Sequence, residues 1–176
     1  MGRHVALLRA VNVGGRKLPM AELRALCGEL GWTEVATYIQ SGNVVFSATG
    51  RDTDLEAALE RAIAKRFGFD VPVMVRNGRE WGGYAKANPF PEVAAKEPNR
   101  LMLLLSKRPP AAGAEEGISA KAAAGEQVRR AGDALWIHYP QGAGTSRLTP
   151  ALIDRAVGSP TTARNYNSVL KIEEML

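Results

Sequence analysis

The chain has 176 residues, of which 45% are hydrophobic and 23% charged, which is ordinary for one globular domain or two small subdomains. No apolar run approaches the roughly 20 residues of a membrane-spanning helix, and Arg9 interrupts the apolar stretch that a secretory signal would need. The only cysteine, Cys27, excludes an intramolecular disulfide. We therefore expect a cytoplasmic protein with a buried, inert thiol.

The net charge of +5 is concentrated near the two ends of the chain. Residues 1–17 carry basic side chains and no acid, and residues 134–172 carry several basic side chains against Asp154 alone. If the two ends meet in space, they form a positive surface that attracts anionic partners. The alternative is that these charges are scattered and solvated.

The first predicted element is a strand, RHVALLRAVNV, and the loop GGRKL follows it. Helical spacing of apolar residues predicts a helix over residues 19–31, and a hairpin over residues 34–48 turns at QSGN. A second helix is predicted to begin with Thr53 as its cap and Glu56 reaching back, and to end at Gly68. With a strand over residues 71–75, the order is β-α-β-β-α-β, which is the ferredoxin-like unit.

The rest of the chain approximates a second round of this order. After a connector, a strand RLMLLLS, a helix over residues 110–125 and a hairpin EQVRRAGDALWIHYP are expected. A helix capped by Thr149, a short strand or loop PTTARNY, and a final helix NSVLKIEEML capped by Asn167 or Ser168 complete it. We predict an α+β fold of two ferredoxin-like halves packed as one compact unit, produced by internal duplication, with a C-terminal helix. Residues 1–76 form the first half, 77–98 the connector and 99–176 the second half.

Three segments carry candidate binding chemistry. In NVGGRKLPM, Gly14 and Gly15 allow positive φ, while Arg16 and Lys17 are placed to meet an anion at a helix N-terminus. This segment does not match the phosphate-loop pattern, and a flexible connecting loop is the alternative. Arg9 is predicted to lie in mid-strand, where its charge requires either a salt bridge or an anionic ligand.

The third segment is TTARNYNS, before the last helix. Arg164, Asn165 and the free N–H groups of that helix could gather an anion, and the alternative is helix capping with ordinary loop hydrogen bonds.

The sequence offers no recognisable catalytic or metal set. His4 and His138 belong to strands with no Ser-His-Asp arrangement, and two histidines with one cysteine are too few for a typical zinc site. We expect no metal and no cofactor. Base stacking of RNA is disfavoured, because the first strand has no aromatic residue and the third offers only Phe46.

The segment LLRAVNVGGRKLPMAELRALCGELGWTEVATYIQSGNVVF and the later ARNYNSVLK resemble the bacterial family called domain of unknown function 1697. GTSRLT resembles the Ser-Lys-Leu motif of that family, with Arg147 in place of lysine. The resemblance implies ferredoxin-like halves and no known activity. The polar residues that it shares with the family's motifs are Arg9, Asn12, Gly14, Gly15, Tyr38, Gln40, Ser41, Gly42, Asn43, Arg164, Asn165 and Asn167.

We hypothesise that these segments converge on one polar site for an anionic ligand. The candidate ligand-binding residues are Arg9, Asn12, Gly14, Gly15, Lys17, Tyr38, Gln40, Ser41, Asn43, Arg147, Arg164, Asn165 and Asn167.

The leading functional hypothesis is a binding module for a phosphorylated small molecule, a nucleotide or a nucleic-acid backbone. One alternative is a structural or interaction protein whose polar motifs pin the two halves together. Another is an enzyme that acts on a phosphorylated substrate and uses Arg9, Lys17 or Arg164 to stabilise charge. The oligomeric state stays open.

Overall fold

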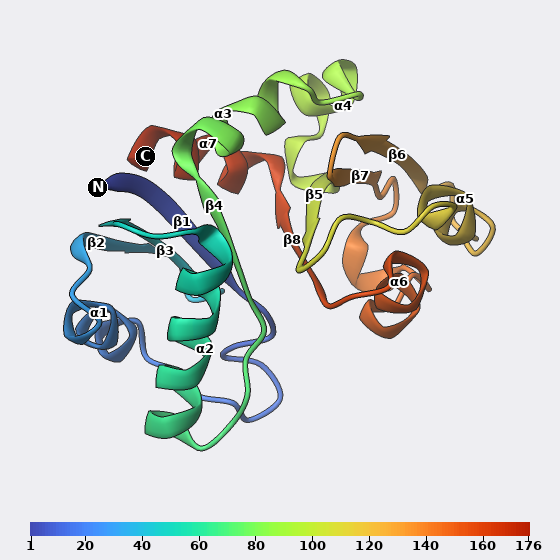
Figure 1. Ribbon diagram of the computed structural model, residues 1–176. Coiled ribbons are helices and arrows are strands. Elements are labelled where there is room, and N and C mark those ends of the chain that lie inside the picture. The colour runs from blue at the N-terminus through green and yellow to red at the C-terminus, as the bar shows by residue number, and fades with distance from the viewer. The chain divides into compact units, whose positions relative to one another are not determined.

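The central strand of the first sheet is β1 (Gly2–Leu8) in a computed structural model that describes all of residues 1–176 (Figure 1). It pairs antiparallel with β3 (Asn43–Ala48) on one side and with β4 (Val73–Asn77) on the other. The strand β2 (Thr33–Tyr38) pairs with β3, so the strand order is β2-β3-β1-β4. β2 and β4 are therefore the edges of this sheet.

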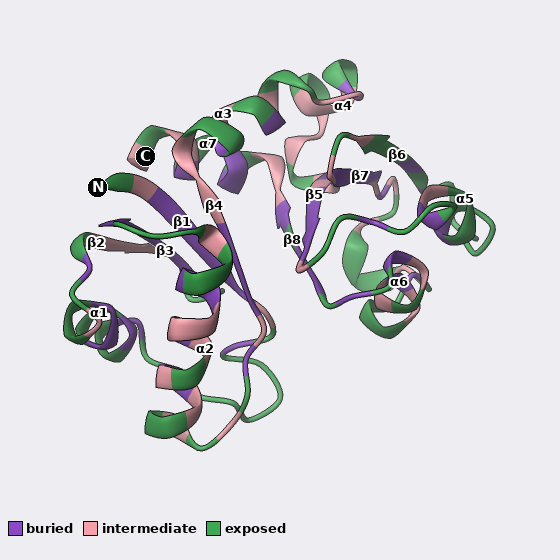
Figure 2. Cartoon of the chain, viewed as in Figure 1, coloured by how far each residue is buried: buried purple, intermediate pink, exposed green.

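Two helices, α1 (Met20–Glu29) and α2 (Asp52–Phe67), pack against this sheet. Alternation along the strands places Ala6 and Leu8 of β1 in one apolar core with the helices, and the inner strands are buried (Figure 2). Within this core the ring of Trp32 stacks on Phe46 with 3.9 Å between centroids.

The second sheet has an equivalent strand order. β5 (Leu101–Ser106) lies between β7 (Ala134–His138) and β8 (Thr161–Asn165), and both pairings are antiparallel. β6 (Gln127–Ala131) pairs with β7, which makes the order β6-β7-β5-β8. The protein thus contains two four-stranded antiparallel sheets.

The helices α5 (Ala114–Ser119) and α6 (Pro150–Val157) cover the second sheet, and Ile118 and Ile153 enter its apolar core. The other helical segments are α3 (Gly78–Lys86), α4 (Pro91–Lys96), α7 (Tyr166–Met175) and the short 3₁₀ helices η1 (Pro98–Arg100) and η2 (Ala143–Thr145). The structure is therefore α+β, with seven α-helices and a helix at its C-terminal end. None of these helices combines the length and the apolar character needed to cross a membrane.

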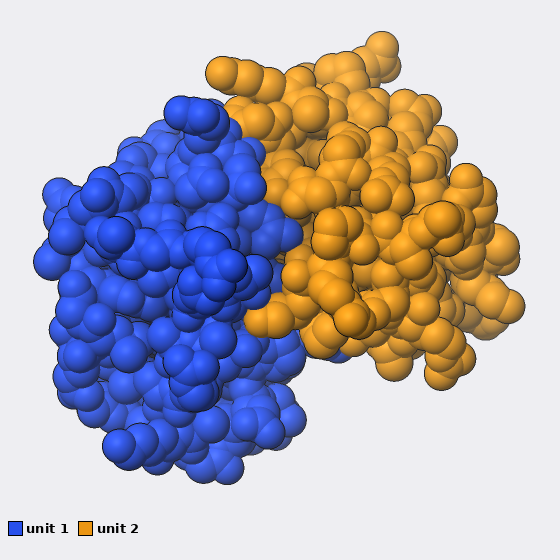
Figure 3. Space-filling view, viewed as in Figure 1, with its two compact units in different colours: residues 1–81, 172–176 blue, residues 82–171 orange.

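The chain divides into two compact units, which Figure 3 colours separately. Unit 1 comprises Met1–Trp81 together with Ile172–Leu176, and unit 2 comprises Gly82–Lys171. Unit 1 is therefore discontinuous in sequence. Its last segment is tied to its first strand, because Arg3 Nη2 donates a 2.6 Å hydrogen bond to the carbonyl oxygen of Met175.

The first strand is shorter than predicted, and Arg9 does not lie in mid-strand. β1 ends at Leu8, because Ala10 and Asn12 take positive φ angles of 52° and 57° that no β-strand contains. Arg9 is half-buried in the loop that follows, and its backbone N–H donates to the carbonyl oxygen of Pro72 at 3.0 Å.

Three helix ends also differ from prediction. α2 begins at Asp52 without a side-chain cap, because Glu56 bonds the backbone N–H of Val75 at 2.9 Å instead of reaching back to Thr53. α5 covers only part of residues 110–125. α7 begins at Tyr166, and its cap is Asn165, whose Oδ1 accepts from the backbone N–H of Ser168 at 2.9 Å. The predicted cap of α6 at Thr149 is confirmed.

Candidate functional site

Asn12 holds the loop of residues 9–18, here called the 9–18 loop, in a folded shape. Its Nδ2 donates to the carbonyl oxygens of Leu18 at 3.1 Å and Gln40 at 2.8 Å, and its Oδ1 accepts from the backbone N–H of Leu18 at 3.0 Å. Both amide hydrogens and the amide oxygen are thus used within unit 1. Asn12 therefore closes the loop on itself and ties it to the turn between β2 and β3.

That turn is docked against the end of β1 by Asn43 and Gly42. Asn43 is fully buried, and its Nδ2 donates to the carbonyl oxygen of Tyr38 at 2.9 Å and to Ser41 Oγ at 3.0 Å. The carbonyl oxygen of Gly42 accepts from the backbone N–H of Leu8 at 2.8 Å. The motif QSGN is therefore a tightly packed turn whose polar groups largely satisfy one another.

The 9–18 loop and the segment that leads into β4 line an open cavity of about 560 Å³. Its lining residues are Arg9, Ala10, Val13, Gly14, Arg16, Asp70 and Pro72. The loop lies beside this segment because β4 runs antiparallel to β1, so that the start of β4 meets the end of β1. Arg16 Nη1 also donates to the carbonyl oxygen of Asp70 at 3.4 Å.

The electrostatics of this cavity favour an anion. The lining includes two basic residues, Arg9 and Arg16, and one acidic residue, Asp70. Arginine presents several N–H donors in a planar fork that matches carboxylate and phosphate oxygens. The left-handed conformation of Gly14, with φ 59°, and the absence of any heavy atom within 4 Å of the position of a Cβ leave its backbone open toward a ligand.

The predicted site residues of unit 1 therefore have different roles. Arg9 and Gly14 line the cavity, whereas Asn12 and Asn43 hold the loop and the turn. The remaining five do not line this cavity and are Gly15, Lys17, Tyr38, Gln40 and Ser41. Asp70 and Pro72 were missed by the sequence reasoning, although an antiparallel pairing of the first and last predicted strands would have located them.

The other four predicted residues belong to unit 2. Arg164 is buried, and its Nη1 donates to Thr162 Oγ1 at 2.7 Å and to the carbonyl oxygen of Ala163 at 2.8 Å. Burial lowers the pKa of Arg164 to about 10, so the side chain keeps its charge at neutral pH. Asn165 caps α7, while Arg147 and Asn167 are exposed. Convergence of these residues with the 9–18 loop on one site stays a prediction.

A buried carboxylate, Glu126, bonds the GTSRLT motif, and no pattern in the sequence indicates it. Ser146 Oγ donates to Glu126 Oε1, and Glu126 Oε2 accepts from the backbone N–H groups of Ala124 at 2.8 Å and Ala123 at 3.1 Å. These hydrogen bonds, led by that from Ser146, lower the pKa of Glu126 to about 2. A carboxylate so strongly stabilised in its ionised form is a poor proton acceptor, so the Ser146–Glu126 pair holds the two loops together.

The remaining reactive side chains have structural surroundings. Burial raises the pKa of Cys27 to about 12, so its thiol stays protonated. His4 Nε2 lies 3.4 Å from Asp52 Oδ1, and His138 Nε2 lies 3.3 Å from Glu97 Oε2. Neither imidazole contacts a hydroxyl or thiol that it could activate as a nucleophile.

These features define an α+β protein with two antiparallel sheets and a conspicuous cluster of fixed polar loops around its first strand. The chain belongs to the family described as protein of unknown function DUF1697, whose sequence model matches residues 1–136. The matched region contains the 9–18 loop and the QSGN turn, whereas the later ARNYNSVLK segment lies beyond it.

The fold recurs in a solved structure, that of the conserved bacterial protein SP0830 from Streptococcus pneumoniae. The two chains are 23% identical, and the similarity covers 99% of this chain and 98% of that one with a TM-score of 0.76. No curated protein sequence matches this chain.

Proposed function

We propose that the protein is a binding module for an anionic ligand, and that the cavity beneath the 9–18 loop is the binding site. The ligand is a phosphorylated small molecule, a nucleotide or the backbone of a nucleic acid. The observation that carries the proposal is that two arginines, Arg9 and Arg16, line a cavity of about 560 Å³ in which Asp70 is the only lining acid. That volume lies within the ~300–1,000 Å³ range of small-molecule sites.

Preorganisation of the loop supports the same proposal. Asn12 closes the 9–18 loop by its two hydrogen bonds with Leu18 and ties it to Gln40. A loop that is already ordered loses little conformational entropy when a ligand binds. The net charge of +5 adds a long-range attraction for anions.

Fluorescence anisotropy of labelled single-stranded RNA and DNA, measured across a salt series, tests the proposal. Binding is expected to weaken steeply with salt, and Arg9→Gln or Arg16→Gln is expected to lower the affinity by about tenfold. Arg61→Gln is the matched control, because Arg61 is an exposed arginine of α2 that does not line the cavity.

Competition with mononucleotides and inorganic phosphate then separates the ligand classes. If mononucleotides displace the labelled strands, the site takes a single phosphorylated group rather than a continuous backbone. Equal affinity of Arg9→Gln, Arg16→Gln and Arg61→Gln would contradict the assignment to this cavity. Addition of Arg164→Gln to the series tests whether Arg164 of unit 2 contributes to the same site.

A structural role for the polar motifs is the second candidate, and the hydrogen bonds of Asn12 and Asn43 favour it. Both side chains use their amide hydrogens on other groups of unit 1. Under this alternative Asn43→Ala unfolds the protein, and no anion protects it against heat. Under the leading proposal, inorganic phosphate or a mononucleotide raises the melting temperature of the wild type and not of Arg9→Gln.

We also infer that each sheet with its two covering helices is a ferredoxin-like half, and that the halves arose by internal duplication. The element order β-α-β-β-α-β in each round and the matching strand orders, β2-β3-β1-β4 and β6-β7-β5-β8, support this. A cytoplasmic location stays a prediction from the single cysteine.

A further inference from the structure

Each of the two sheets carries a cavity between its pair of helices, and the two cavities differ in charge. The cavity between α1 and α2 has a volume of about 430 Å³ and includes Glu29, Lys65 and Arg66 in its lining. Arg66 Nη2 is held there by the carboxylate of Glu29 at 2.6 Å, and its Nη1 lies 3.7 Å from Glu22. The guanidinium of this first cavity is therefore already neutralised by the protein.

The cavity between α5 and α6, here called the α5–α6 groove, has a volume of about 330 Å³ and no acid in its lining. Lys121 and Arg155 line it, and neither side chain has a hydrogen bond or an ion pair in the structure. The acid next to Arg155 in sequence is occupied elsewhere, because Asp154 Oδ1 accepts from the backbone N–H of Thr161 at 3.0 Å and from its hydroxyl at 2.8 Å. Two positive charges therefore face this groove without a counterion from the protein.

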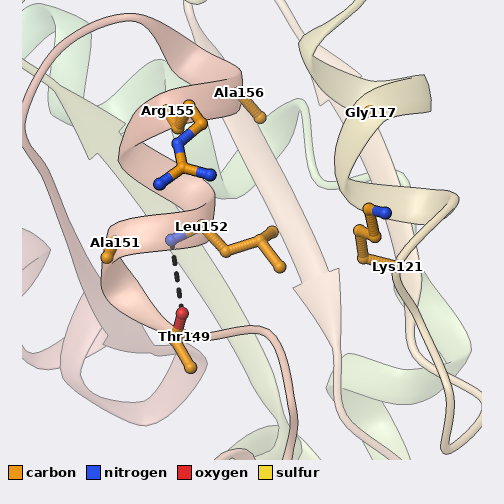
Figure 4. A pocket seen from close by; sticks show the side chains of 7 residues that line it. All are labelled: Gly117, Lys121, Thr149, Ala151, Leu152, Arg155 and Ala156. Carbon is orange, nitrogen blue, oxygen red and sulfur yellow. Dashed lines mark hydrogen bonds between the residues drawn. The ribbon is translucent and has the colours of Figure 1, made fainter.

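The rest of the groove is apolar apart from one hydroxyl. Figure 4 shows Leu152 extending from α6 toward α5, with the Arg155 guanidinium on α6 and Lys121 at the end of α5. Ala151 and Ala156 add small apolar surface. Thr149 Oγ1 accepts from the backbone N–H of Leu152 at 3.3 Å, which leaves its O–H free to donate.

We propose that the α5–α6 groove is a second binding site, which takes an organic phosphate monoester with a small apolar or aromatic body. The dianion of a phosphate monoester balances the charges of Lys121 and Arg155, and the guanidinium fork matches its oxygens. The apolar body packs on Leu152 and Ala156, where its burial adds affinity that inorganic phosphate lacks. This site shares no residue with the cavity of the 9–18 loop.

The test is an NMR titration of the ¹⁵N-labelled full-length protein with phenyl phosphate. The backbone amide signals of Gly117, Leu152 and Ala156 report binding in the groove. Saturable shifts of these signals are expected at low ionic strength, with weaker binding when salt is added. Inorganic phosphate is expected to bind more weakly, and benzyl alcohol is expected to cause no saturable shift.

Variants then assign the binding to the groove. Arg155→Gln is expected to weaken phenyl phosphate binding by about tenfold, and Lys121→Gln to weaken it as well. Lys65→Gln is the matched control, because Lys65 lines the corresponding groove between α1 and α2 and its loss leaves the Arg66–Glu29 pair intact. Both groove residues are exposed, so their replacement leaves the fold intact, and the dispersion of the other amide signals verifies this.

Three results would overturn the proposal. The first is the absence of saturable shifts in the groove, including the case in which shifts occur only in the 9–18 loop. The second is equal affinity of Arg155→Gln and the wild type. The third is equal affinity for inorganic phosphate and phenyl phosphate, because the apolar surface would then contribute nothing. A negative result for the α5–α6 groove does not contradict the proposed site in the 9–18 loop, because the amide signals of that loop are monitored separately in the same titration.

Discussion

Gly42 lies where the QSGN turn meets the end of β1, and no other residue fits there. Its φ is 81°, and an added Cβ would lie 2.7 Å from Val11 Cγ2 and 2.8 Å from Leu8 Cβ. Both neighbours are buried core residues, so they have little room to move. Both the left-handed backbone conformation and the lack of space for a Cβ therefore require glycine at this position.

Gly42→Ala is therefore expected to destabilise the protein by about 3 kcal/mol, the sum of left-handed strain and overpacking. Gly31→Ala is the matched control, because Gly31 has a φ of 80° with nothing within 4 Å of the added Cβ. The control is expected to lose only about 1 kcal/mol. Urea denaturation of both variants measures the difference, and equal losses would contradict the close approach at Gly42.

Glu126 predicts a dependence of stability on pH. Its pKa in the folded protein is about 2, lowered from an ordinary 4.5 by the Ser146 hydroxyl and the backbone N–H groups of Ala124 and Ala123. Because the folded pKa is the lower one, its contribution is complete above about pH 4.5 and is lost as the pH falls through about 2.

Glu126→Gln removes this contribution and is expected to be less stable than the wild type at pH 7. The two proteins are expected to converge in stability as the pH is lowered toward 2, because the wild-type carboxylate then becomes protonated. Denaturant unfolding at a series of pH values measures this. A constant difference between the two proteins over that window would rule out the titration of Glu126 as its cause.

Of the seven residues that line the cavity, Arg9, Gly14 and Arg16 could be anticipated from their own sequence pattern, whereas Asp70 and Pro72 could not. Arg9 and Gly14 stand out because a charge beside a strand and a glycine pair in a loop are unusual. Asp70 and Pro72 lie in the irregular segment between α2 and β4, and only the pairing of β4 with β1 brings them to the cavity. The role of Glu126 could not be predicted for the same reason, because its partner Ser146 is remote in sequence.

At the scale of the elements, helix carboxylates bond three of the four edge strands of the two sheets, β4, β6 and β8. Glu60 and Glu56 of α2 accept from the backbone N–H groups of Val73 at 2.8 Å and Val75 at 2.9 Å along the edge strand β4. In the second sheet, Asp154 of α6 accepts from the backbone N–H of Thr161 in β8 at 3.0 Å. Glu115 of α5 accepts from the backbone N–H of Arg130 in β6 at 3.0 Å. Two outward-facing N–H groups of β4 and one each of β6 and β8 are thereby satisfied.

Glu60→Ala is expected to cost about 1–2 kcal/mol and to raise the tendency to aggregate, because the N–H of Val73 loses its acceptor. Glu60→Gln keeps an oxygen acceptor and is expected to lie between the wild type and Glu60→Ala. Thermal unfolding with parallel light scattering measures both effects. Identical behaviour of the alanine and glutamine variants would show that the hydrogen bond to β4 has no part in them.

The same carboxylates explain why element ends were harder to predict than elements. The spacing of Thr53 and Glu56 fits a capping box, yet Glu56 bonds β4, because a buried strand edge competes for the same oxygen. Predictions from strong local patterns were confirmed where no such competition exists. The apolar run of β5 is a strand, and Thr149 caps α6. In α5, alanine propensity predicted a longer helix, but the backbone N–H groups of Ala123 and Ala124 bond Glu126 instead.

At the scale of the whole molecule, the first unit depends on the last residues of the chain. Ile172 is fully buried, and Met175 supplies the carbonyl oxygen that Arg3 of β1 bonds at 2.6 Å. Removal of residues 172–176 is expected to destabilise the protein by about 2–5 kcal/mol, mainly because the buried side chain of Ile172 is lost.

Hydrogen exchange of the β1 amides measures this loss, and protection of β1 is expected to fall in the shortened chain. Removal of Leu176 alone is the control, since it leaves both Ile172 and the Arg3–Met175 hydrogen bond in place. Unchanged protection of β1 after removal of residues 172–176 would show that unit 1 is complete without them.

This discontinuity sets an order of events during synthesis on the ribosome. Residues 1–81 emerge before residues 82–171, and in most proteins an N-terminal unit folds before the following one is made. Here the segment Ile172–Leu176 is translated after the whole of unit 2, so unit 1 cannot be completed until unit 2 has been made. Unit 1 is thus begun before unit 2 and completed only after it, and until then Arg3 of β1 lacks the carbonyl oxygen of Met175 as its acceptor.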